Sequence, residues 1–168
     1  MRSVLLPLIL SALMFATGCA TLGAIVQPPR FEQAPDRQAE VRILPPSTSQ
    51  PLGGAGIRLW AKVTNPNPFG FTLRTLTTTL LLEGSRAASG DFPLGLPLSA
   101  GQESVVPLDL SISFSDLPGL ANVLRRAVTG GVIPFQLDGT IGIDAGRLGQ
   151  PSFGPMLLMR GEIAPRTP

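Results

Sequence analysis

Few side chains in this sequence are able to carry out chemistry. There is no histidine and no tyrosine, and Cys19 is the only cysteine. Ser-His-Asp and Cys-His catalysis are excluded, because both need an imidazole to accept a proton. A conventional zinc site, which needs several cysteine or histidine ligands, is excluded as well. Asp109, Asp138 and Asp144 remain as candidates for a hydrolase, but nothing places them as a facing pair. No catalytic residue, no metal site and no cofactor are therefore predicted.

The position of Cys19 predicts a different chemistry. Arg2 precedes an apolar run over residues 4–15, which is shorter than the roughly 20 residues that span a bilayer and matches a secretory signal peptide. The next residues, 16–19 (Ala-Thr-Gly-Cys), resemble the lipobox of bacterial lipoproteins, although leucine is commoner at the first of these positions. This resemblance implies cleavage between Gly18 and Cys19 and acylation of the Cys19 thiol. The alternative is an ordinary signal peptide followed by a chance cysteine.

Acylation would make the membrane a partner of the chain. Two or three acyl chains are enough for stable anchoring, so the expected location is the cell envelope. Ala20 follows the cysteine, and no aspartate stands there to suggest retention in an inner membrane. The outer membrane is therefore favoured in a diderm cell.

The residues after Cys19 predict a tether and then one domain. Residues 20–36 contain three prolines and no periodicity, so we expect a flexible segment that reaches roughly 20–25 Å. The predicted organisation is a lipoprotein signal peptide over 1–18, a lipidated N-terminus and tether over 19–36, and a single domain over 37–165.

Most of the domain alternates between apolar and polar residues with a period of two, which is the pattern of half-buried β-strands. Segment 57–64 has Ile57, Leu59, Ala61 and Val63 on one face and polar or large residues on the other. The same pattern predicts strands over 76–82, 105–114 and 132–144, with less distinct strands over 40–44 and 156–163. Segment 86–92 is expected to pair back on the preceding strand after a turn at Gly84-Ser85.

One segment has helical spacing instead. Apolar residues recur every three or four positions between residues 117 and 128, Arg125 and Arg126 lie near the end, and Gly130-Gly131 follows. Cations near the last turn and a glycine after it are typical of a helix C-terminus. The predicted fold is all-β, a β-sandwich with one α-helix inserted around 117–129.

Composition argues for a folded domain that does not bind nucleic acid. The 168 residues are 43% hydrophobic and 14% charged, against about 25% charged in ordinary soluble domains. The net charge is +2, Lys62 is the only lysine and the arginines are scattered. A nucleic-acid interface needs a basic stripe, and no such stripe is present in the sequence. The sequence contains no oligomerisation signal, so the oligomeric state is left open.

Two local features are candidate sites. The first is a motif that follows the strand over 57–64 and reads Asn65-Pro66-Asn67-Pro68-Phe69-Gly70. Each asparagine is pushed toward extended geometry by the proline after it, so we expect a rigid corner; a direct ligand role for Asn65 or Asn67 is the alternative. The second is Trp60, which shares an outward face with Arg58 and Lys62 and is a candidate partner surface unless other segments cover it.

The motif and the segments after it resemble the group-two late embryogenesis abundant family, also called the water stress and hypersensitive response (WHy) domain. The similar segments, in order, are 65–70, 73–84, 98–110, 133–140 and 159–163, and the resemblance covers about residues 40–165. One departure is a run of threonines at 77–79, where an aromatic residue is common. The resemblance implies a seven-stranded, antiparallel, fibronectin-like β-sandwich with one helix and no enzymatic activity.

The resemblance also implies a role in desiccation or osmotic stress. Together with the lipobox it predicts a membrane-anchored, non-enzymatic lipoprotein that protects or binds client proteins of the envelope. The alternative is binding or transfer of a lipid or another apolar ligand, because a sandwich that is splayed at one end could admit an acyl chain between its sheets.

Overall fold

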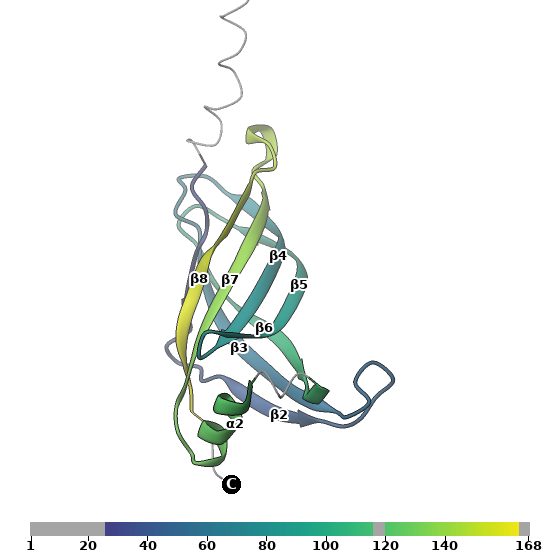
Figure 1. Cartoon of the computed structure of the whole chain (residues 1–168). Coiled ribbons are helices and arrows are strands. Elements are labelled where there is room, and N and C mark those ends of the chain that lie inside the picture. Colours follow the sequence, from purple (N-terminus) through teal and green to yellow (C-terminus); the bar gives the residue numbers. More distant parts are fainter. Residues whose placement is uncertain (1–25, 116–119, 165–168) are drawn as a thin grey trace, which may run out of the picture.

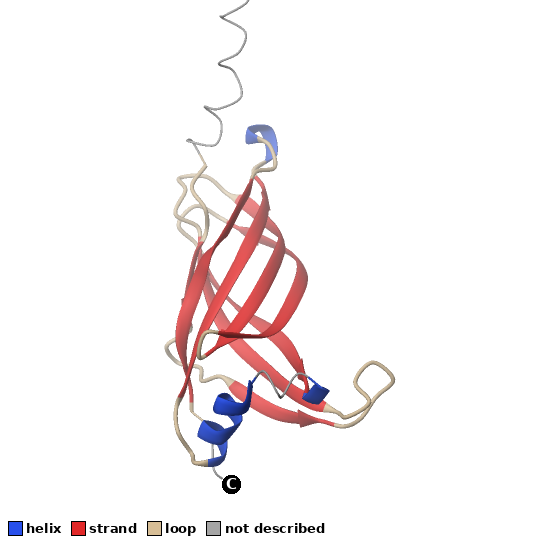
Figure 2. Cartoon of the chain, in the orientation of Figure 1, coloured by secondary structure: helices blue, strands red, loops and turns tan. Residues whose placement is uncertain are grey.

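Eight β-strands form two four-stranded antiparallel sheets in the computed structural model, which describes residues 26–115 and 120–164 (Figure 1). Sheet A contains β1 (Arg30–Gln33), β2 (Glu40–Leu44), β3 (Gly54–Thr64) and β6 (Glu103–Ser113). Sheet B contains β4 (Phe71–Leu82), β5 (Ser85–Leu98), β7 (Ile133–Asp144) and β8 (Ser152–Ile163). The two sheets pack as layers, and the short helix α2 (Ala121–Val128) lies at the lower end of the view (Figure 2).

Strand alternation builds the core between the two sheets. Buried and less buried residues alternate along most of β3, β6 and β7, as at Ile133, Phe135 and Leu137. The largest fully buried side chains come from both sheets and include Leu59, Leu73, Leu76, Leu80, Leu108 and Leu137. The apolar faces of the two sheets therefore meet, as the period-two pattern requires.

Sheet A is organised around β3. β6 pairs with β3 along its whole length, from Gly54↔Ser113 to Thr64↔Glu103. The other edge of β3 is shared by two short strands, with β2 opposite residues 54–58 and β1 opposite residues 61–64. Sheet B has the order β5-β4-β7-β8. β1 lies against β8 and β5 against β6, which brings the edges of the two sheets together on both sides.

The prediction of an all-β fold with one helix is confirmed, but the strand count of seven was wrong. The additional strand is β1, which lies inside the segment 19–36 that the sequence assigned to a tether. Val26, Phe31 and Ala34 are buried, and Ala34 N donates a hydrogen bond to Trp60 O. A four-residue strand between prolines is too short to show a period, so its burial depends on β3 and β8 rather than on a local pattern.

The seven predicted strands all occur in the structure, some of them longer than predicted. Segment 86–92 belongs to β5, which pairs antiparallel with β4 after a tight turn through Glu83 and Gly84. Both turn residues have positive φ, a conformation that favours glycine at the second position. The helix over 117–129 is observed as α2, and residues 116–119 lie outside the described residues. The predicted signal peptide over 1–18, Gly18 and Cys19 also lie outside them.

Candidate functional site

The 65–70 motif forms the corner between β3 and β4, and Asn65 is buried at its centre. The Asn65 amide Nδ2 donates to the main-chain oxygens of Phe69 at 2.8 Å, Ser99 at 3.0 Å and Leu98 at 3.2 Å. Its Oδ1 accepts hydrogen bonds from the main-chain N of Asn67 at 2.9 Å and from Asn67 Nδ2 at 3.1 Å. One side chain thus joins the corner to the end of β5.

Asn67 holds the beginning of the described chain. Its Oδ1 accepts a hydrogen bond from Gln27 N at 2.8 Å, and its Nδ2 donates to Gln27 O at 2.9 Å. The side chain of Asn67 thus bonds both the N–H and the C=O of one residue, as the main chain of a neighbouring strand would. Asn67 is itself buried and Val26 is buried beside the core. Because both asparagine side chains are fully engaged with main-chain groups and with each other, this corner has a structural role.

The outer face of sheet A carries two ion-pair groups. Arg58 on β3 makes a bidentate contact with Asp109 on β6, with Nε–Oδ1 at 2.8 Å and Nη2–Oδ2 at 2.9 Å, and Arg42 on β2 lies 3.7 Å from the same carboxylate. Lys62 lies 3.1 Å from Glu32 and 3.6 Å from Glu103. These pairs cross from β1 and β2 over β3 to β6.

The ion pairs also perturb the titration of their members. The hydrogen bond from Arg58 lowers the pKa of Asp109 below its ordinary value of 3.8; partial burial opposes this effect, and the charges of Arg58 and Arg42 add to it. The pKa of Arg58 is raised, chiefly by the same hydrogen bond. The pKa of Lys62 is raised, first by its hydrogen bond to Glu32 and then by the charge of Glu103. All these charges are satisfied within sheet A, so they stabilise its outer face.

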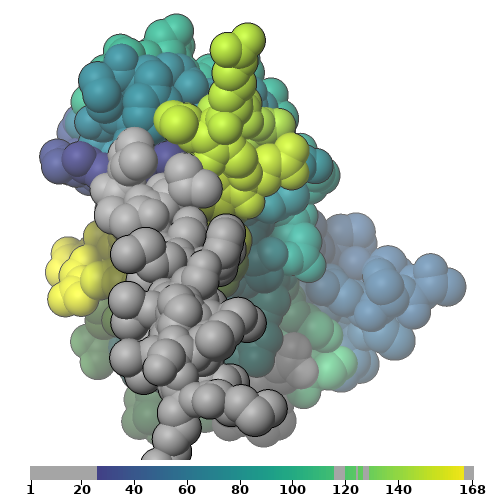
Figure 3. Space-filling view, turned by 90° about the horizontal axis from the view of Figure 1, so that it is seen from above, coloured from purple at the N-terminus to yellow at the C-terminus, as the bar shows by residue number. Residues whose placement is uncertain are grey.

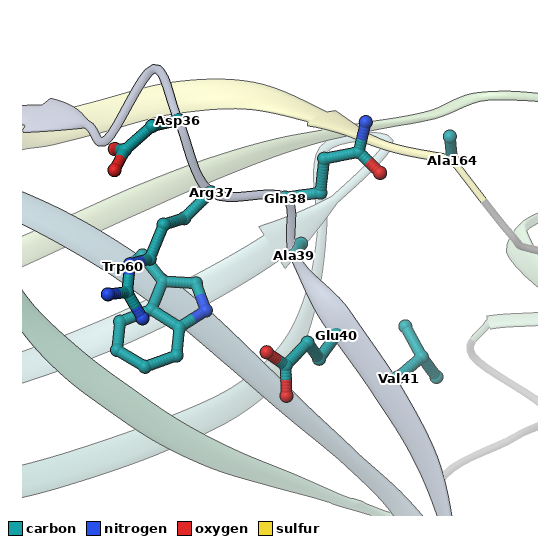
Figure 4. Close-up of a pocket in the computed structure, with 8 residues that line it drawn as sticks. All are labelled: Asp36, Arg37, Gln38, Ala39, Glu40, Val41, Trp60 and Ala164. Carbon is teal, nitrogen blue, oxygen red and sulfur yellow. The ribbon is translucent and has the colours of Figure 1, made fainter.

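Trp60 lies on the same face between the two ion-pair groups, and it is half-buried. The Arg37 guanidinium is stacked 4.3 Å above the centre of its ring, within the range of a cation–π interaction, and the Arg58 guanidinium lies 5.8 Å away. The chain between β1 and β2 and the residue after β8, Ala164, enclose a shallow open pocket of about 760 Å³ beside the ring (Figure 4). Arg58, Trp60 and Lys62 are thus brought together, but each is already held by other residues.

The three aspartates that the sequence left as hydrolase candidates are not brought together. Asp109 is engaged by Arg58 on sheet A. Asp138 accepts hydrogen bonds from Gln136 Nε2, and Asp144 accepts one from Gly146 N at the far end of β7. Within residues 26–115 and 120–164, no group of three or more His, Cys, Asp or Glu side chains is placed to hold a metal ion.

One surface that the sequence did not predict is an apolar lip on β2 and the loop after it, formed by Val41, Ile43 and Leu52. These side chains are 53%, 74% and 65% exposed. Val41 pairs with Ile57 and Ile43 with Ala55, so Val41 and Ile43 lie on the face of sheet A that is buried elsewhere. The alternation in the sequence indicates which face these two residues share. It does not indicate whether sheet B covers them, and their exposure depends on that.

The comparisons with known proteins identify the family. The sequence model of the LEA_2 family, described as late embryogenesis abundant protein, matches residues 61–155, which include the whole 65–70 corner. The chain belongs to this family. LEA_2 proteins are generally non-enzymatic, and membership of this family suggests a protein that is related to stress or binds a ligand.

Solved structures share the fold of this LEA_2 chain. The solution structure of a late embryogenesis abundant protein has 21% identity and a TM-score of 0.52, and the match covers 94% of this chain and 83% of that one. The solution structure of a protein from Arabidopsis thaliana has 18% identity and a TM-score of 0.54, with 74% and 77% covered. No curated protein matches the chain. No helix in the described residues is long and apolar enough to cross a membrane.

Proposed function

We propose that this LEA_2 protein is a non-enzymatic lipoprotein that is anchored to the cell envelope through acylated Cys19 and protects envelope proteins during desiccation or osmotic stress. The observation that carries the proposal is the family match over residues 61–155, joined to an apolar N-terminal run that ends in Ala-Thr-Gly-Cys. The single cysteine of the chain stands where a lipobox requires it.

The apolar lip supports the protective role. A protein that is losing water exposes apolar segments that are normally buried, and an exposed apolar surface can contact them. Val41, Ile43 and Leu52 offer such a surface outside the filled core. The outer face of sheet A, opposite to the one that carries Val41 and Ile43, is occupied by ion pairs, so the lip is better suited than that face to an unfolding client.

Drying tests the protective role. A labile enzyme is dried with residues 20–168 of this chain, and its activity is measured after rehydration. We expect more surviving activity than with an equal mass of an inert protein, and less protection from a Val41→Ser, Ile43→Ser double variant. Protection no better than that of the inert protein would remove the claim.

Anchoring is tested separately with radiolabelled palmitate. The full-length chain should incorporate the label and sediment with the membrane fraction, and the outer membrane is expected in a diderm host. The Cys19→Ala chain should do neither. Equal membrane attachment of the two chains would refute acylation at Cys19.

A second candidate function is the binding of a lipid or another apolar ligand, and the lip is also the observation that favours it. The core between the sheets is filled by side chains such as Leu59 and Leu73, so an acyl chain would have to bind at the β2 end. Native mass spectrometry of the soluble domain, isolated from lipid-containing cells, should then show an added lipid mass that the Val41→Ser, Ile43→Ser variant lacks. A clean apo mass would exclude this candidate.

A further inference from the structure

We propose that the end of the sandwich that carries the 65–70 corner faces the membrane and that the apolar lip points away from it. The inference rests on the proposed acylation of Cys19 and adds the orientation of the domain. Its partner is a lipid surface, and its evidence is the place where the described chain begins and the length of chain before it.

The chain enters the domain at one end only. Gln27 is fixed to Asn67 by the two hydrogen bonds described above, and Val26 is buried. Figure 1 shows this first described segment at the upper end of the sandwich, and α2 and β2 at the lower end. Residues 26–36 belong to the sandwich, with Val26, Phe31 and Ala34 buried. They therefore do not lengthen the linker between the lipid and the domain.

The linker between Cys19 and Val26, called the leash below, is short compared with the domain. Seven peptide steps separate Cys19 from Val26, and a fully extended chain covers at most about 3.6 Å per residue, or about 25 Å in all. On the lip, Ile43 pairs with Ala55, whereas Arg30 pairs with Thr64, nine residues farther along β3, which corresponds to about 30 Å of strand. Val26 lies beyond Arg30, next to the segment that is bonded to Asn67. If the lip faced the membrane, Val26 would stand farther from the lipid than the leash can reach.

The upper end is also suited to close contact with headgroups. It is formed by the 65–70 corner, the 98–102 turn and the 145–150 loop, which border one another around a shallow hollow. Figure 3 looks down on this end and shows the 145–150 loop in yellow-green beside the teal surface of the other segments. These three segments contain one charged residue, Arg147, and no acidic residue. Asp144 also lines the hollow, so Arg147 is set against one carboxylate and this end carries little net charge toward anionic headgroups.

The carboxylates that flank this end are already engaged. Glu103 lies 3.6 Å from Lys62, and Asp144 accepts hydrogen bonds from Gly146 N and Gln150 Nε2. The charge of Glu103 is thus partly compensated by Lys62, whereas Asp144 is bonded to neutral groups and keeps its charge. The side faces differ, because the outer face of sheet A presents the ion-paired residues Glu32, Arg58 and Asp109.

Energy transfer from a labelled thiol to a lipid probe tests the orientation. Acylation consumes Cys19, so an introduced cysteine is the only free thiol of the mature chain. The variants are Ala100→Cys at the upper end, Ser49→Cys in the loop beside the lip, and Ser111→Cys and Thr77→Cys on the outer faces of the two sheets; all four positions are exposed. Each acylated full chain is reconstituted into vesicles of phosphatidylethanolamine and phosphatidylglycerol that contain a rhodamine lipid.

We expect transfer to be several-fold stronger from position 100 than from position 49, with positions 111 and 77 between them. Equal transfer from all positions, or strongest transfer from 111, 77 or 49, would overturn the proposal. As a control, about sixty Gly and Ser residues are inserted after Thr21, which gives the leash a root-mean-square length of about 40–50 Å and should abolish the gradient. A gradient that survives the insertion would overturn the leash as its cause.

This result is separable from the proposed function. Transfer is measured only on chains that float with the vesicles and carry the acyl mass. Failure to float refutes anchoring, whereas a flat gradient on floated chains refutes the orientation alone.

Discussion

At the scale of single residues, two asparagines replace main-chain pairing where prolines prevent it. Pro66 and Pro68 have no N–H to donate, and the Asn65 and Asn67 amides connect the corner to the end of β5 and to the first described residues. A buried amide that satisfies several main-chain groups is costly to remove, because each group left without a partner loses hydration as well as its bond.

Asn65→Ala should therefore destabilise the domain by about 2–4 kcal/mol, through the unsatisfied oxygens of Phe69, Leu98 and Ser99. Urea unfolding of residues 20–168 measures this difference. Asn122→Ala, at an exposed position of α2, is the control and should change stability little. A loss no larger for Asn65→Ala than for the control would mean that these contacts are not important for stability.

Asp109 should contribute to the acid sensitivity of the fold. Its pKa is lowered in the folded chain by Arg58, so its ionised form stabilises the fold above about pH 4, and this stabilisation is lost as pH falls through the lowered value. Asp109→Asn should reduce the fall in the urea midpoint between about pH 6 and about pH 3. Because the pair is on the surface, the effect should be small and should shrink with added salt. Asp91→Asn, at an exposed position of β5, is the control; an equal change in both variants would contradict the argument.

At the scale of elements, β1 decides where the domain begins. It pairs with residues 61–64 on one edge of β3 and lies against β8, with Phe31 buried in the core. A chain that starts at residue 37 would expose the partners of Val26, Phe31 and Ala34 and leave part of the β3 edge unpaired.

The chain 37–168 should therefore be less stable than the chain 20–168 by at least about 3 kcal/mol, which is typical of losing a large buried side chain together with strand pairing. Thermal or urea unfolding of the two chains checks this. A chain that starts at residue 24, which keeps every described residue, should behave like the longer one. Equal stability of the 37–168 chain would restore the predicted tether boundary.

The strands differ in how far they can be predicted from sequence. Long, half-buried strands such as β3 and β7 are recognisable because alternation over ten or more residues is hard to produce by chance. β1 is not, because four residues between prolines carry no period. The distant partners of Asn65 and Asn67 could not be predicted either, since Leu98 and Gln27 lie 33 and 40 residues away. The lip was missed because alternation indicates the side of a strand, not whether another sheet covers it.

At the scale of the whole molecule, one continuous core joins the two sheets. Buried residues of β3, β4, β6 and β7 form a single cluster. If one sheet were lost, the apolar side chains of the other would be exposed to water. Small domains built in this way usually unfold in one cooperative transition.

Cooperative unfolding of the two sheets can be tested with Trp60. It is the only tryptophan of the chain and lies on β3, so its fluorescence reports on sheet A. Urea unfolding of residues 20–168 followed by Trp60 fluorescence and by far-ultraviolet circular dichroism should give coincident curves. A fluorescence transition that precedes the dichroism transition would mean that sheet A opens separately.

The contact between β1 and β8 has a consequence for synthesis. The first and last strands of the described chain are neighbours, yet a ribosome produces β8 only after every other described strand. Until then the nascent polypeptide lacks the outermost strand of sheet B, and β1 has nothing to lie against on that side. Closure of the sandwich is thus a late event that joins distant parts of the chain, the kind of pairing that slows folding. Until closure, the apolar faces of its strands are exposed and able to associate with other chains.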